Sequence, residues 1–152
     1  KLLRPVNELM NMYNQSVGRN ATLILGLTPD LRGLMPAGDV KRLKEFGDEL
    51  KRIYDKPIAQ VSGSGRTVEM KLEPDMAFNI VVIQEDIKHG QRVREYTLEI
   101  MKDGKWERLA KGTSIGQKRI QHVSLTDTQR LRLTCSKSIA DPIIKRLAVY
   151  RR

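Results

Sequence analysis

An apolar run most constrains the fold of this chain: residues 21–27 are ATLILGL. The run is too short for a helix and lacks polar alternation, as is typical of a parallel strand covered on both faces. Thr28, Pro29 and Asp30 then end it. Such a strand needs neighbouring strands, because its backbone N–H and C=O groups have no partners within their own segment.

Amphipathic helices are predicted on both sides of this run. Apolar residues recur at steps of three and four along residues 2–17 and again along residues 40–53. Pro5 is tolerated in the first turn of the first helix, and Asp39 is available as the N-cap of the second. Helix, buried strand and helix make a fragment of an α/β layer. We therefore expect that residues 1–55 cannot fold alone.

In the rest of the chain the apolar period changes to two, which is typical of strands with one face in water. Such strands are predicted at 68–72, 95–100 and 130–135, with a more buried strand at 80–83 and a last strand at 143–150. A hairpin turn is expected at Asp103-Gly104. About seven short strands with regular turns predict an antiparallel β-sandwich or jelly roll. The predicted domains are residues 1–56 and 57–152, with the boundary near the polar stretch VSGSGR, 61–66.

The net charge of +10 raises the question of a nucleic-acid partner, because clustered Lys and Arg release counterions from phosphates. The basic residues are scattered, usually with an acidic residue nearby, and the aromatic residues do not recur as a stacking platform. No apolar run approaches the roughly 18 residues that span a bilayer. We therefore expect neither nucleic acid nor a membrane as a partner.

Metal and cofactor chemistry is not predicted. The single Cys135 stands with only His89 and His122, at spacings unlike those of a metal site. The stretch GSGR at 63–66 is too short for a phosphate loop. The chain begins at Lys1 without a methionine, from which we expect a longer parent chain.

Glu85 and Asp86 form the most conspicuous carboxylate pair of the second part. Paired carboxylates are the usual acids and bases of glycoside hydrolysis. Adjacent residues on a strand point to opposite faces, so these two cannot flank one bond. Our preferred interpretation is an ion pair between one of them and Arg92 or Arg94 that fixes the loop at 88–93.

Trp106 follows the hairpin turn in DGKWERL and allows two interpretations. A tryptophan here can anchor the core or offer a stacking platform for a sugar, and we favour the core anchor. The Asn-Ala-Thr sequon at 20–22 lies at the mouth of the predicted buried strand, where a glycan would not fit. We interpret the sequon as a chance match.

Two stretches carry a resemblance to a known family. Residues 13–50, YNQSVGRNATLILGLTPDLRGLMPAGDVKRLKEFGDEL, resemble the end of the catalytic barrel in bacterial α-L-fucosidases of glycoside hydrolase family 29. The second part is similar to the C-terminal β-sandwich of that family through 80–99, the DGKW turn at 103–106, and GTSIGQKRI at 112–120. The resemblance covers essentially the whole chain.

The resemblance implies a place for each element. Residues 22–27 would be the last strand of a (β/α)8 TIM-like barrel, residues 2–17 the helix before it and residues 40–54 the closing helix. The sandwich would be of the galactose-binding-like type. The strands that pair with residues 22–27 would belong to an upstream barrel domain of the same protein.

The resemblance also implies a function. Enzymes of this family are retaining exo-glycosidases that remove terminal α-L-fucose from glycans, using an aspartate nucleophile and a second carboxylate as acid and base. Both carboxylates belong to earlier barrel strands, so we assign no catalytic residue here and expect this chain alone to hydrolyse nothing. The family habit implies a periplasmic or extracellular location. The motif forms look closer to the subgroup acting on α-1,3- and α-1,4-linked fucose.

Gly26, Thr28 and Arg32 would then lie at the barrel mouth, at the carboxyl end of the strand, and contact the substrate. The family commonly has Asn where this chain has Gly26, so the loss of an amide can change fine specificity. The alternative function is a non-catalytic carbohydrate-binding module, for which the chain offers few planar groups: Trp106, Tyr96 and His89.

Overall fold

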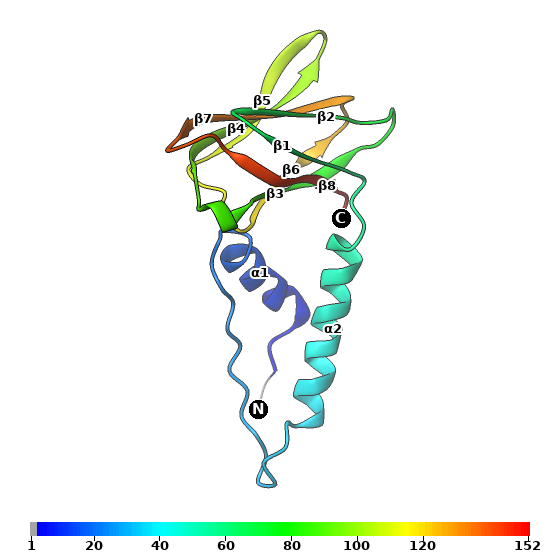
Figure 1. The fold of residues 1–152 in the computed structure, drawn as a ribbon. Coiled ribbons are helices and arrows are strands. Elements are labelled where there is room, and N and C mark those ends of the chain that lie inside the picture. Colours follow the sequence, from blue (N-terminus) through cyan, green and yellow to red (C-terminus); the bar gives the residue numbers. More distant parts are fainter. Residues whose placement is uncertain (1–2) are drawn as a thin grey trace.

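A computed structural model of the chain describes residues 3–152, as two helices below a β-sandwich (Figure 1). The helices are α1 (Val6–Ser16) and α2 (Ala37–Tyr54), and a short 3-10 helix η1 spans Ile87–His89. The strands are β1 (Ala59–Ser64), β2 (Thr67–Lys71), β3 (Phe78–Glu85), β4 (Val93–Lys102), β5 (Lys105–Gly112), β6 (Arg119–Thr126), β7 (Arg130–Ser138) and β8 (Ile143–Tyr150).

The eight strands form two four-stranded antiparallel sheets, ordered β1-β8-β3-β6 and β2-β7-β4-β5. The predicted sandwich is confirmed, with one strand more than expected. The predicted ranges and the hairpin account for six of the eight strands, and no predicted range covers β1 or β6, which carry few apolar residues at alternating positions. Val61–Ser64 of the predicted boundary stretch belong to β1, and Gly65, at φ 93°, makes the turn into β2.

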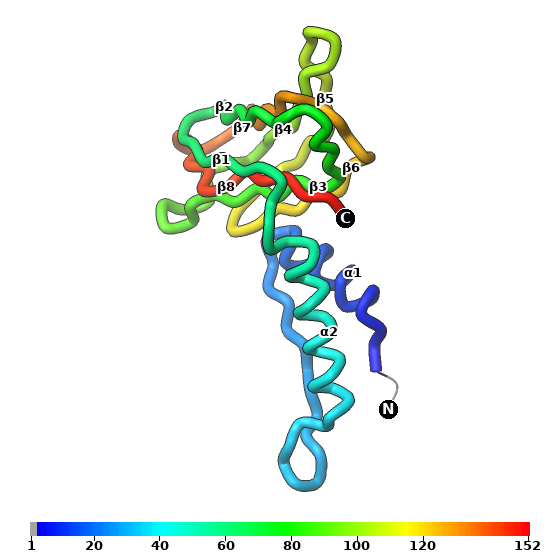
Figure 2. Tube along the Cα trace, turned by 90° about the vertical axis from the view of Figure 1, so that its right-hand side faces the viewer, coloured from blue at the N-terminus to red at the C-terminus, as the bar shows by residue number. Residues whose placement is uncertain are grey.

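Strand β3 is buried on both faces and divides the core in two. Val81 and Ile83 face the interior between the sheets, while Ile80 and Val82 face the helices. The second core joins the outer face of one sheet to both helices through its buried members Leu9, Met10, Phe46, Ile53, Ile80, Val82, Ile120, Ala148 and Tyr150. The sandwich therefore packs directly on α1 and α2, as both views show (Figures 1 and 2).

The helix starts differ from the predicted ones. Helix α1 begins after Pro5, and residue 2, the first of the predicted helix 2–17, lies outside the described residues. Helix α2 begins at Ala37 with Pro36 as its N-cap, so the predicted N-cap Asp39 lies within the first turn instead. Proline fixes φ near the helical value, which favours it at a helix start, and an acidic residue in the first turn suits the helix dipole.

The predicted strand at residues 21–27 is not a strand here. Residues 21–30 run extended beside α2, away from the sandwich (Figure 2), and no strand among residues 3–152 pairs with them. Leu23 and Leu25 pack partly against the helices, whereas Ile24 between them is 85% exposed. The alternation indicates a strand-like backbone with one face covered. It forms no ladder because the described residues offer it no neighbour.

Glu85 does not form the predicted ion pair. Its carboxylate is buried and accepts backbone N–H bonds from Arg92 at 2.8 Å, Val93 at 3.0 Å and Gly116 at 2.8 Å. These bonds join the end of β3 to the start of β4 and to the loop before β6, so Glu85 fixes the predicted loop through its backbone. A buried carboxylate is satisfied best by several N–H donors.

The other three members of the predicted ion pairs also bond elsewhere. Asp86 accepts a bond from the backbone N–H of Lys88 at 3.3 Å and contacts His89 Nδ1 at 3.2 Å. Arg92 donates to the backbone oxygen of Asp141 at 2.7 Å, and Arg94 donates to backbone oxygens of its own segment. Within residues 3–152, no salt bridge joins either carboxylate to Arg92 or Arg94.

We predict that Glu85→Ala lowers the free energy of unfolding by about 3 kcal/mol, because it leaves buried N–H donors unpaired. Urea denaturation of the two proteins measures the difference. Glu107, exposed on β5, is the matched control, and Glu107→Ala is expected to change stability by less than about 0.5 kcal/mol. Equal stability of the Glu85 and Glu107 variants would contradict this role.

Candidate functional site

The predicted mouth residues lie on the segment between α1 and α2, which runs away from the sandwich and turns back at its far end (Figure 1). Gly26 and Thr28 are exposed on the extended segment, and Arg32 lies in the loop that turns towards α2. A Cβ atom on Gly26 would meet nothing within 4 Å, so packing in this chain does not require glycine there.

Asp30 organises this loop. Its Oδ1 accepts backbone N–H bonds from Arg32 at 2.9 Å and Leu34 at 3.0 Å, and its Oδ2 accepts two bonds from the Arg32 guanidinium, at 2.9 and 3.1 Å. The hydrogen bond from the Arg32 side chain holds the pKa of Asp30 below its ordinary value. Arg32 therefore presents a guanidinium that is positioned by a local carboxylate.

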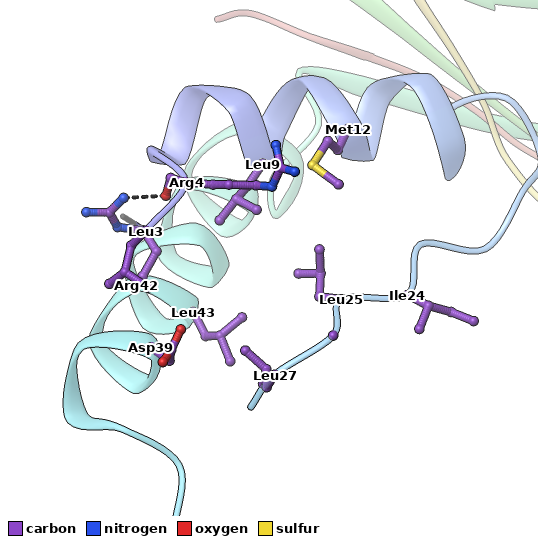
Figure 3. Close-up of a pocket in the computed structure, with 11 residues that line it drawn as sticks. Leu3, Arg4, Leu9, Met12, Ile24, Leu25, Leu27, Asp39, Arg42 and Leu43 are labelled. Atoms are coloured by element: carbon purple, nitrogen blue, oxygen red, sulfur yellow. Dashed lines mark hydrogen bonds between the residues drawn. The ribbon is translucent and has the colours of Figure 1, made fainter. Parts of the chain in front are cut away.

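A pocket of about 350 Å³ lies between the extended segment and the two helices. Figure 3 shows its lining, in which Arg42 donates a hydrogen bond to the backbone oxygen of Arg4. Its lining residues are Leu3, Arg4, Leu9, Met12, Ile24, Leu25, Gly26, Leu27, Asp39, Arg42 and Leu43. Asp39 is the single carboxylate among them, whereas glycoside hydrolysis needs two. The pocket cannot perform that reaction with these side chains.

Apolar side chains are exposed along the same segment and the start of α2, and we call them the apolar edge: Ile24, Leu27, Leu31, Leu34, Met35 and Val40. A concentration of this kind on one short segment is typical of a surface that binds a partner or a ligand. The apolar edge continues directly from the residues that we predicted at the barrel mouth.

Trp106 is not a core anchor. It stands half-buried at the start of β5, paired with Met101 in the hairpin, and its ring contacts two guanidinium groups on β7: Arg132 at 4.1 Å and Arg130 at 5.2 Å. The hairpin extends beyond the sandwich (Figure 1), so the ring is shielded by cations rather than by the core.

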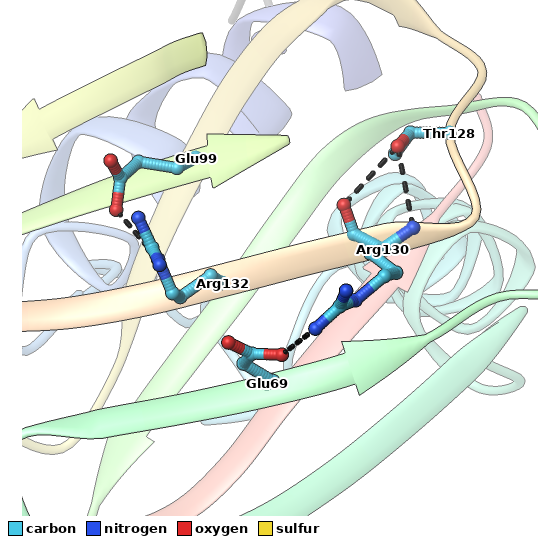
Figure 4. Close-up of polar contacts among 5 residues, drawn as sticks. All are labelled: Glu69, Glu99, Thr128, Arg130 and Arg132. Carbon is cyan, nitrogen blue, oxygen red and sulfur yellow. Dashed lines mark hydrogen bonds and ion pairs between the residues drawn. The ribbon is translucent and has the colours of Figure 1, made fainter. Parts of the chain in front are cut away.

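The two arginines are held by carboxylates on neighbouring strands (Figure 4). Arg132 Nε lies 2.9 Å from Glu99 on β4, and Arg130 Nη2 lies 2.6 Å from Glu69 on β2. The Arg132 hydrogen bond, helped by one from Thr134, holds the pKa of Glu99 below its ordinary value of 4.5, although burial opposes this. The cluster stabilises the outer face of this sheet.

The remaining planar groups do not join Trp106 in one platform. Tyr96 is 1% exposed in the core, and its hydroxyl accepts a bond from Gln121 Nε2 at 2.6 Å. His89 is exposed on η1. Asn20 of the sequon donates to Gln91 at 3.1 Å and accepts from the backbone N–H of Gln117 at 2.7 Å, so its amide is used within the fold.

Sequence reasoning missed a second polar site. An open pocket of about 780 Å³ on the outer face of the β1-β8-β3 sheet is lined by Gln60, Val61, Ser62, Gln84, Lys145 and Arg146. The available signal was the adjacent Lys145 and Arg146 within an otherwise apolar strand. Among residues 3–152 no three His, Cys, Asp or Glu side chains gather closely enough to hold a metal ion, and neither helix is long and apolar enough to cross a membrane.

We predict that Glu99→Gln makes unfolding stability less dependent on acid. A carboxylate whose pKa is lowered by folding stabilises the protein above its ordinary pKa, and this stability is lost as pH falls through the lowered value. Between about pH 6 and about pH 3, the wild-type chain should lose up to about 1 kcal/mol more than the variant. Urea denaturation at each pH checks this, and Glu107→Gln should behave as the wild type. A Glu99→Gln profile equal to the wild-type profile would refute the assignment.

Comparison with known proteins gives consistent matches to one kind of enzyme. No protein-family model matches the chain. Alpha-L-fucosidase 1 of Arabidopsis thaliana is 28% identical over 184 aligned positions, covering 97% of this chain and 36% of the relative. The chain thus spans about a third of the length of that relative.

Solved structures agree. A Bacteroides thetaiotaomicron protein assigned as an α-L-fucosidase is 49% identical, with a TM-score of 0.94 over 99% of this chain and 34% of that protein. A glycoside hydrolase family 29 member from an unknown rumen bacterium is 30% identical, with a TM-score of 0.84 over 97% of this chain and 29% of that protein. In sequence and fold, the chain is therefore similar to a part of α-L-fucosidases that makes up about a third of their length, and these enzymes are glycoside hydrolases.

Proposed function

We propose that this chain is the C-terminal portion of a retaining exo-α-L-fucosidase that hydrolyses terminal α-L-fucosyl linkages, α-1,3 or α-1,4, in glycans outside the cytoplasm, in the periplasm or extracellular space. The likeness to relatives named as α-L-fucosidases over nearly the whole chain supports the enzyme class. The chain spans only about a third of the length of each relative, which supports its role as one part of a larger protein.

The observation that carries the proposal is the extended segment 21–27, which has no strand partner within residues 3–152 and contributes Ile24 and Leu27 to the apolar edge. Its alternating burial, with Leu23 and Leu25 against the helices and Ile24 exposed, suits a barrel strand whose helix-facing side is already covered. We propose that it is the last strand of a (β/α)8 barrel, with α1 before it and α2 closing the ring. The strands of the parent protein would then supply the missing ladder on both edges.

The catalytic carboxylates are proposed to lie elsewhere in the parent. Retaining hydrolysis needs a nucleophile and an acid about 5 Å apart, and the pocket beside Gly26 has the single carboxylate Asp39. Gly26, Thr28 and Arg32 follow or end the proposed strand, where barrel enzymes bind substrate. Their proposed role is contact with the glycan, with Arg32 held in place by Asp30.

The sandwich is proposed to brace the barrel. The outer face of β3 and β8 buries Ile80, Val82 and Tyr150 against α1 and α2, which fixes both helices relative to the extended segment. A carbohydrate-binding role for the sandwich is the alternative, and Trp106 supports it poorly because Arg132 lies 4.1 Å from its ring. Glycan-array binding by the chain at the Trp106 face would favour that alternative.

The experiment that tests the proposal compares hydrolysis of 4-nitrophenyl α-L-fucoside and of α-1,3- and α-1,4-fucosylated trisaccharides by the intact parent protein and by the 152-residue chain. Release of fucose by the parent and none by the chain is expected. No release by a folded parent from any of these substrates would overturn the enzyme assignment, and turnover by the chain alone would overturn its role as a non-catalytic part.

We predict that Ile24→Asp has little effect on the stability of the chain but strongly destabilises the parent protein. In the chain, where Ile24 is 85% exposed, the change should alter the free energy of unfolding by less than about 0.5 kcal/mol. In the parent, burying an unpaired carboxylate in the barrel should cost more than about 3 kcal/mol and reduce fucose release. Ile139, 69% exposed between β7 and β8, is the control, and Ile139→Asp should be tolerated in both. Equal tolerance of both variants in the parent would refute the barrel strand.

A further inference from the structure

The open pocket on the sandwich is built from three neighbouring strands, and we call it the basic pocket. Gln60 and Ser62 come from β1, Gln84 from β3, and Lys145 and Arg146 from β8. The helices cover the other end of the same sheet face, at Ile80 and Tyr150, and leave this end open. The basic pocket is therefore the part of this face that the chain itself does not bury.

A β-bulge places two cations in the basic pocket. In the pairing of β3 with β8, Gln84 lies opposite Arg146 and Glu85 lies opposite Ile144, so Lys145 has no partner. Ile144 and Leu147 both face the interior between the sheets, and the two residues between them both line the pocket. A regular strand would send adjacent side chains to opposite faces, whereas a bulge redirects one of them.

The basic pocket carries positive charge without a matching carboxylate. Its lining residues include no acidic side chain, and Glu85 beside it has its oxygens occupied by backbone N–H groups. Within residues 3–152, neither Lys145 nor Arg146 takes part in a salt bridge. The buried Nε of Arg146 also lacks a hydrogen-bond partner there, while its Nη2 donates to the Tyr150 hydroxyl at 2.7 Å.

Neutral polar groups surround the two cations. Gln60 and Ser62 supply amide and hydroxyl groups, which can donate to and accept from the hydroxyl groups of a sugar. Gln84 Nε2 already donates to the backbone oxygen of Gln117 at 3.0 Å, so Gln84 offers its amide oxygen as an acceptor. Gln84 also lines an adjacent pocket of about 300 Å³ that includes Asn20, Gln117 and Lys118. The polar surface is therefore larger than a site for a small free ion.

We propose that the basic pocket binds an oxyanion, sulfate or carboxylate, that is carried by a sugar. Lys145 and Arg146 would pair with the anionic group, since charge-assisted hydrogen bonds are the strong ones, and the amides would contact the neighbouring hydroxyls. The sugar in this assignment rests on the proposed function, whereas the oxyanion rests on the pocket alone. The site lies on the sandwich and is separate from the proposed barrel mouth.

Isothermal titration of the 152-residue chain with four probes tests the assignment: galactose 6-sulfate, galacturonate, galactose and inorganic sulfate. One of the two acidic sugars should bind at least about tenfold more tightly than galactose and than inorganic sulfate, with affinity that falls as salt is added. The tighter acidic sugar identifies the anionic group. Equal binding of all four probes, or no binding of either acidic sugar, would overturn the proposal.

Variants distinguish binding in the basic pocket from a general attraction of acidic sugars to the positively charged surface. Lys145 is exposed, and its side chain forms no salt bridge within residues 3–152, so Lys145→Ser should keep the unfolding midpoint and weaken binding of the acidic sugar about tenfold. Arg146→Gln should weaken it further, and Lys105→Ser on the exposed hairpin should not. Unchanged binding by Lys145→Ser would refute the site. No turnover enters these measurements, so an inactive parent would leave their outcome readable, and absent binding would leave the fucosidase proposal standing.

Discussion

The extended segment 21–27 is the constraint on which the interpretation of this molecule depends. It has no strand partner within residues 3–152, although the N–H of Ala21 at its start donates to the backbone oxygen of Ser16 at 2.9 Å. Its side chains alternate between the helix core and the surface, yet no strand among residues 3–152 supplies a hydrogen-bonded neighbour. In this chain, water can bond to the backbone of the segment. If another surface covers the apolar edge and excludes that water, the backbone N–H and C=O groups need protein partners. The helices cover one side of this segment, and we propose that strands of the parent protein cover the other.

The sandwich and the helices form one packed unit through β3. Val81 and Ile83 close the interior between the sheets, and Ile80 and Val82 close the layer over α1 and α2. Strands with one wet face would not hold the helices, so the double burial of β3 is what relates the two parts. The same sheet leaves its other end open, and there the bulge in β8 gathers charge.

Much of the fold was predictable because burial imposes periodicity. Strands β2, β4 and β7 show clear alternation, and α1 and α2 show stripes at steps of three and four. The irregular positions were not predictable: Glu85 bonds to backbone N–H groups that only the tertiary fold brings together, and Trp106 extends past the core on its hairpin. The basic pocket depends on the bulge at Lys145: the sequence shows two adjacent cations, but not the register shift that brings both of them to one face. Gly26, Thr28 and Arg32 share one loop region because they are close in sequence, and their role stays a proposal.

Amide hydrogen exchange of residues 22–27 tests the central claim most directly, measured in this chain and in the intact parent protein under the same conditions. If the segment is a barrel strand, its amides should exchange rapidly in the chain, where no ladder protects them, and at least about a hundredfold more slowly in the parent. Equally rapid exchange in both proteins would mean that the segment has no strand partners, and would contradict the account.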